Sequence, residues 1–113
     1  MPNSEVDRET LDSLRSILED RFDLLITTYI NDSEGRRIRL REAVERFDFA
    51  AIRHEAHGLK GSSRNIGANN FADICAIVEE QASHEDKTGL EQNVAAIENR
   101  LAAVFEELNQ VLH

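Results

Sequence analysis

Apolar residues recur at helical spacing along nearly the whole of this chain, and little interrupts them. Intervals of three and four residues place such side chains on one face of an α-helix. The residues that most often end regular structure are scarce, because the 113-residue sequence has one proline, Pro2, and only five glycines. Short strands and tight turns depend on these residues. The pattern therefore favours long helices over any sheet.

The periodicity predicts five helical segments. We expect a short helix over about 7–18 and longer ones over about 20–47, 49–66, 69–84 and 88–112. The second pattern weakens near Gly35, where one long helix bends or two helices meet, and we favour one helix. Asp48 should cap the third helix, and Gly67 should follow it with positive φ. Because short connections make neighbours antiparallel, we predict one all-α domain over residues 1–113, an antiparallel up-down four-helix bundle with a short additional N-terminal helix.

Charge and composition exclude several classes of function. The net charge is −9, from 22 acidic and 13 basic residues, so we expect neither nucleic acid nor an anionic membrane as a partner. No apolar run is long enough to span a bilayer, and the polar start MPNSEVDRE is not a signal peptide. The single cysteine, Cys75, precludes an internal disulfide and suits the cytoplasm. We interpret it as a small buried hydrophobe.

One stretch, HEAHGLKGSSRNIGA over residues 54–68, is unusual for a helix. On a helical wheel the core face of this segment comprises Ile52, Ala56, Leu59, Ser63 and Ile66. His57 lies about 125° from the centre of that face, and Gly61 lies one turn further along the same exposed sector. The same patch around Gly61 also collects three cations, Arg53, Lys60 and Arg64. His54 points almost directly away from the core.

An exposed imidazole among cations can accept a phosphoryl group. Neutral imidazole is a nitrogen nucleophile near pH 7, and neighbouring cations stabilise the added negative charge. Gly61 costs about 1 kcal/mol relative to alanine within a helix, and the gain is access to the ring for a partner or an anion. The alternative is that His57 is an ordinary surface histidine.

Other chemistries fit this stretch poorly. A zinc protease needs H-E-x-x-H, whereas H-E-A-H is one residue short and lacks a third ligand, so we expect no metal. GLKGSS has the wrong order for a phosphate-binding P-loop, and no strand precedes it. Ser62 and Ser63 lie within a helix, where no oxyanion hole forms. We expect no cofactor.

The residues Ala56-His57-Gly58-Leu59-Lys60-Gly61-Ser62-Ser63, followed after three residues by Gly67-Ala68, resemble the histidine-containing phosphotransfer (HPt) domains of bacterial two-component phosphorelays. The resemblance implies a phosphorelay intermediate in which His57 is the phosphoacceptor. It would take a phosphoryl group from the receiver domain of a hybrid sensor kinase and pass it to the receiver domain of a response regulator. Lys60, with Arg64 and Arg53, would stabilise the phosphate, and Gly61 would leave room for the receiver. Without an ATP site, we expect a stoichiometric phosphocarrier and not an enzyme.

Three questions stay open in the sequence. Many family members carry glutamine where Glu79 stands, and this carboxylate would orient the His57 ring, repel an incoming phosphoryl group, or simply face solvent. The docking face would combine an apolar residue of the second helix, such as Tyr29 or Ile38, with the surface around Gly61. A helical adaptor that binds a signalling partner without chemistry is the alternative function. We expect a monomer.

Overall fold

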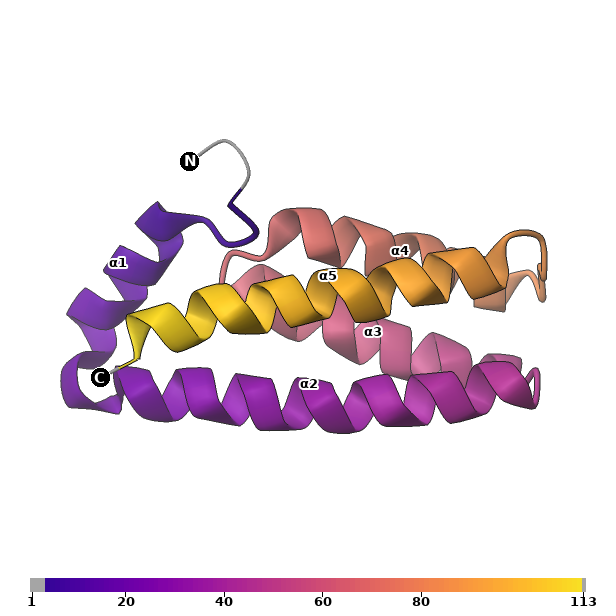
Figure 1. The fold of residues 1–113 in the computed structure, drawn as a ribbon, viewed down its shortest axis with the longest axis horizontal. Helices are drawn as coiled ribbons and strands as arrows, with labels where there is room; N and C mark the ends of the chain where they lie inside the picture. Colours follow the sequence, from indigo (N-terminus) through magenta and orange to yellow (C-terminus); the bar gives the residue numbers. More distant parts are fainter. Residues whose placement is uncertain (1–3, 113) are drawn as a thin grey trace.

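The computed structural model describes residues 4–112, which fold into α-helices joined by short turns. The elements are α1 (Arg8–Leu18), a 3-10 turn η1 (Glu19–Arg21), α2 (Phe22–Glu45), α3 (Phe49–Asn65), α4 (Asn69–Ser83) and α5 (Leu90–Val111). Figure 1 shows α2 to α5 side by side in one elongated bundle, with α1 (indigo) across one end. The all-α four-helix bundle with a short N-terminal helix is confirmed. The single domain over 1–113 stays a prediction, since residues 1–3 and 113 lie outside the described part.

Helix α2 settles the question at Gly35, because it runs without a break through that residue. Its end differs from the prediction, which carried the helix to Phe47. The helix stops at Glu45, and Phe47 has a φ of 52°. Phe47 is 48 % exposed, and the ammonium of Lys87 lies 4.2 Å from the centroid of its ring. Phe47 thus continues the apolar periodicity past the helix end, into the turn before α3.

Both ends of α3 follow the predicted signals. The Asp48 carboxylate accepts a hydrogen bond from the Ala51 amide at 3.2 Å and caps the first turn. At the other end Gly67 has a φ of 89°, a conformation that residues with a Cβ rarely adopt. The Ala68 amide then donates to the Ser63 carbonyl at 2.9 Å. These two ends fix which side chains of α3 face the other helices.

Side chains from α2 to α5 fill the core, and the predicted inner face of α3 is buried throughout. The fully buried residues include Ile26, Leu40, Ile52, Leu59, Phe71, Cys75, Val78, Ile97, Leu101 and Val104. Tyr29 belongs to this core, since it is 5 % exposed and its hydroxyl lies 2.7 Å from Ser63 Oγ. It is therefore unavailable to a docking partner, contrary to the sequence interpretation. Ile38 is 46 % exposed.

Charged side chains join α2 to α5 along the bundle. Arg41 donates to Glu98 at 2.6 and 3.1 Å and to both carboxylate oxygens of Glu91 at 2.8 Å. These hydrogen bonds from Arg41 lower the pKa of the Glu98 carboxyl, against an opposing effect of partial burial. The pairing links α2 to α5 through side chains outside the apolar core.

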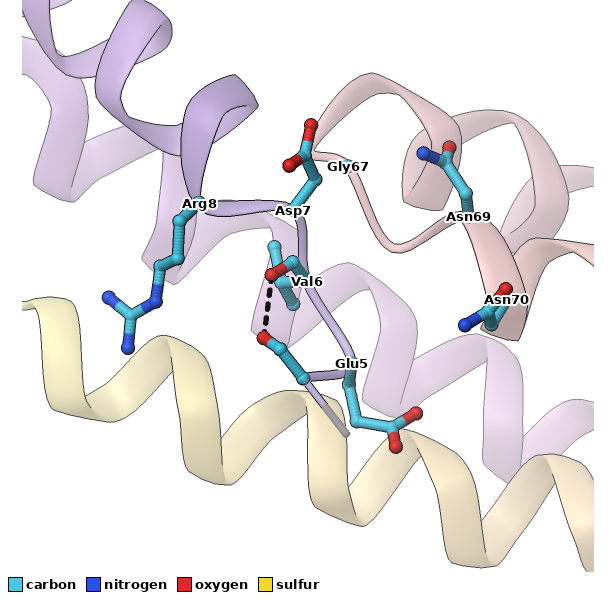
Figure 2. Close-up of a pocket in the computed structure, with 8 residues that line it drawn as sticks. Glu5, Val6, Asp7, Arg8, Gly67, Asn69 and Asn70 are labelled. Carbon is cyan, nitrogen blue, oxygen red and sulfur yellow. Dashed lines mark hydrogen bonds between the residues drawn. The ribbon is translucent and has the colours of Figure 1, made fainter. Parts of the chain in front are cut away.

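The segment before α1 is tied to the rest of the bundle. The Val6 amide donates to the Glu107 carboxylate on α5, as does that of Glu5. The Asp7 amide donates to the Gly67 carbonyl in the α3–α4 turn at 3.0 Å. Figure 2 shows this segment running from beside α5 toward Gly67. Residues next to α1 are thus anchored to two elements that lie far away in the sequence.

Candidate functional site

His57 lies in the middle of the outer face of α3, with 68 % of its side chain exposed. Ring nitrogen Nδ1 lies 2.9 Å from Glu79 Oε2 on α4. Within residues 4–112, Nε2 has no hydrogen-bond partner, so one nitrogen is held and the other is open to an incoming group.

Glu79 contacts Lys60 as well as His57. Lys60 Nζ forms an ion pair with Oε1 at 2.7 Å, and the Glu79 side chain is only 18 % exposed. Partial burial works to raise the pKa of Glu79, but hydrogen bonds from Lys60 and His57 outweigh it and lower that pKa. The carboxylate is therefore ionised at neutral pH and can only accept. It follows that Nδ1 is the donor, and in the neutral ring Nε2 therefore carries the lone pair.

The two glycines that follow His57 have different surroundings. A Cβ added to Gly61 would meet nothing within 4 Å, so the surface beside His57 is bare there, as the sequence suggested. A Cβ on Gly58 would come within 2.3 Å of the Arg36 guanidinium, which crosses from α2. Only Gly61 therefore opens the surface, while Gly58 accommodates an arginine.

The sequence interpretation missed the residue that holds this arginine. Glu55 is 6 % exposed, and its carboxylate accepts from Arg36 Nη1 at 3.1 Å and from Arg39 Nε at 3.0 Å. A signal was present in the sequence, because the wheel puts Glu55 only about 75° from the centre of the core face. A carboxylate so close to a core requires cationic partners.

The predicted cations are not equally close to the ring. Arg53 shares a shallow hollow of about 300 Å³ with Ala50, His54, His57 and Glu79. Arg64 lies seven residues beyond His57, about 10 Å along the helix, and donates to Asp73 on α4 at 3.2 Å. The structure thus brings Arg53 and Lys60 to the site and holds Arg64 at its margin.

A hollow of about 340 Å³ lies at the end of the bundle and is lined by the segment before α1 (Figure 2). It is separated from His57 by roughly 12 Å of helix, and several of its polar groups already bind Glu107 and Gly67. We therefore take the surface around His57, and not this hollow, as the candidate site. Within residues 4–112 no three His, Cys, Asp or Glu side chains are grouped to hold a metal, and no helix could cross a membrane.

Comparison with known proteins identifies the family. The sequence pattern of the Hpt domain matches residues 24–110. The crystal structure of histidine-containing phosphotransfer protein B (HptB) from Pseudomonas aeruginosa PAO1 is 32 % identical in sequence, with a TM-score of 0.91 over 96 % of this chain and 94 % of that one. No curated protein sequence gave a significant match. Both matches agree with a helical bundle that carries an exposed histidine. This chain belongs to the Hpt domain family, whose members are phosphocarriers and not kinases.

Proposed function

We propose that His57 is the residue through which this phosphorelay intermediate accepts and donates its phosphoryl group. The observation that carries the proposal is the asymmetry of the ring, with Nδ1 held 2.9 Å from Glu79 and Nε2 exposed beside the bare surface of Gly61. A nucleophile needs a free lone pair and an open path to the reacting atom. Of the alternatives for Glu79, this geometry supports orientation of the ring.

The surrounding cations have distinct roles in this proposal. Lys60 keeps the Glu79 carboxylate from presenting an uncompensated negative charge to the incoming phosphoryl group. Arg53 lies in the same hollow as His57 and stabilises the transferred phosphate. Arg64 contributes only if it leaves Asp73 as the partner docks. Gly61 gives the active-site loops of a receiver domain room to approach.

Hpt proteins interact with receiver domains, and for this chain we propose two such partners. One is the receiver domain of a hybrid sensor kinase, which supplies phosphate, and the other is the receiver domain of a response regulator, which takes it. The chain acts as a monomer and turns over no ATP of its own. Its phosphate content is then limited to one group for each His57.

The test is phosphotransfer from a labelled receiver domain to three forms of the protein: the wild type, His57→Gln and His54→Gln. His54 lies on the same helix and is also exposed, so it is a matched control. We expect acid-labile label on the wild type and on His54→Gln, and none on His57→Gln. Label retained by His57→Gln refutes the assignment. A partner that binds all three forms equally, without any transfer, indicates an adaptor instead.

A further inference from the structure

Both oxygens of the Glu79 carboxylate are in use, one by the His57 ring at 2.9 Å and one by Lys60 at 2.7 Å. We propose that Glu79 keeps the proton on Nδ1 of His57 throughout the reaction, so that phosphorylated His57 departs as neutral imidazole when it donates its phosphoryl group. This inference rests on the proposed function and makes Glu79 a positioning residue that also sets the reactivity of the phosphorylated state.

In the accepting step, the Nε2 lone pair forms a bond to phosphorus. The bond between phosphorus and the aspartyl oxygen of the donor breaks, and its electron pair stays on the aspartate carboxylate. The ring now carries a positive charge, because Nδ1 retains its proton. The Glu79 carboxylate at 2.9 Å compensates that charge, so no proton has to leave as the phosphoryl group arrives.

In the donating step, the bond between phosphorus and Nε2 breaks and its electron pair returns to Nε2. If Nδ1 still holds its proton, the product is neutral imidazole. If Nδ1 has lost its proton, the departing group is an imidazolate anion, which is far more basic and leaves slowly. A carboxylate that stabilises the protonated ring therefore keeps phosphorylated His57 competent as a donor.

Lys60 explains why the proton stays on the ring and is not taken by the carboxylate. Its ammonium stabilises the ionised form of Glu79 and so makes it a weak base. The other ionisable groups near the ring are Arg53 and His54, in the same hollow, and Arg36, which reaches Gly58 from α2. The two arginines disfavour a positively charged ring, and Glu79 is the group that opposes them.

The experiment uses the full chain phosphorylated with phosphoramidate, as wild type, Glu79→Gln and Glu80→Gln. Glutamine has the size of glutamate but no charge. Glu80 is the matched control, because its replacement removes the same charge from α4 at a side chain that is 73 % exposed and contacts His84 instead. Nitrogen-15 NMR follows the protonation of Nδ1 in phosphorylated His57 against pH, and His57→Gln provides the blank. Donation to one receiver domain is measured over the same pH range.

We expect the midpoint of Nδ1 protonation to fall by about one to three pH units in Glu79→Gln, as for loss of an opposite charge in contact, and to stay near the wild-type value in Glu80→Gln. Between the two midpoints, donation by Glu79→Gln should slow by about tenfold for each pH unit that separates the pH of the assay from the lowered midpoint. The wild-type midpoint should also exceed that of a phosphorylated peptide of residues 54–61. This comparison holds even if the Glu79→Gln variant does not fold. Equal midpoints overturn the inference but leave His57 as the acceptor, whereas absence of phosphate on His57 in every form refutes the proposed function.

Discussion

Replacing Gly58 and Gly61 by alanine separates two roles that one residue type has in α3. Both lie within the helix, where alanine is favoured over glycine by about 1 kcal/mol. Gly61→Ala should realise this gain in full, because its new Cβ meets nothing within 4 Å. Gly58→Ala cannot, because its Cβ would lie 2.3 Å from Arg36 Nη1 and the guanidinium has to move.

The loss at Gly58 follows from what Arg36 contacts. Its hydrogen bond to Glu55 joins a guanidinium that is 23 % exposed to a carboxylate side chain that is 8 % exposed, and a bond to a charged group is worth about 1.5–3 kcal/mol. Against the gain from helix propensity, Gly58→Ala should lower the free energy of unfolding by about 0.5–2 kcal/mol. The two variants should then differ by about 1.5–3 kcal/mol, and with opposite sign relative to wild type.

Urea unfolding followed by circular dichroism measures the stability of both variants under the same conditions. The matched test repeats Gly58→Ala in an Arg36→Ala background, where the substitution should become stabilising by about 1 kcal/mol. If Gly58→Ala stabilises the protein as much as Gly61→Ala does, Arg36 can move aside and still keep its hydrogen bond to Glu55. The reasoning that Arg36 requires a glycine at position 58 is then wrong.

Three further predictions concern Tyr29, Glu98 and a larger side chain at Gly61. Burial raises the pKa of Tyr29 to about 12, above the ordinary 10.0, so the native state keeps this proton longer. Stability should therefore fall between about pH 10 and pH 12, by up to roughly 1.4 kcal/mol per pH unit, and Tyr29→Phe should flatten that part of the curve. Hydrogen bonds from Arg41 lower the pKa of Glu98 below its ordinary 4.5, so this stabilisation is present above pH 4.5 and is lost as the pH falls through the lowered value. When stability is measured against decreasing pH, Glu98→Gln should not show this loss of stability. Gly61→Arg should keep its helicity, because arginine is the better helix former, yet should block transfer from a receiver, and unimpaired transfer means that Gly61 has another role.

Periodicity predicted most of the fold because each helix here buries one face. The wheel put Ile52, Leu59 and Ser63 on the inner side of α3 and His57 outside, and the structure agrees. The end signals at Asp48 and Gly67 succeeded because each is a local backbone requirement. Phe47 misled the prediction, because an apolar residue in a turn continues the same spacing as a helix.

The contacts that the sequence did not predict depend on how two helices are rotated against each other. A helical wheel describes one helix at a time and does not contain this information. From the sequence alone, Glu55 is an ordinary polar residue, and its role follows only from Arg36, which α2 places beside it. Tyr29 was expected to be an apolar residue available for docking, but α3 covers it and Ser63 pairs with its hydroxyl. Glu79 had three possible roles in the sequence, and only the pairing of α3 with α4 puts its carboxylate on His57 Nδ1.

The packing of the segment before residue 24 determines where this module can be cut. Val6, Leu11 and Phe22 are 1 %, 3 % and 1 % exposed, yet all three precede the stretch of 24–110 that carries the family pattern. Burial of such side chains contributes about 1.5–3 kcal/mol each, so together they approach the 5–15 kcal/mol that typically separates a folded domain from its unfolded chain. The boundary of the family pattern therefore lies inside the cooperative folding unit, and an excised fragment of 24–110 should behave as a partly folded chain.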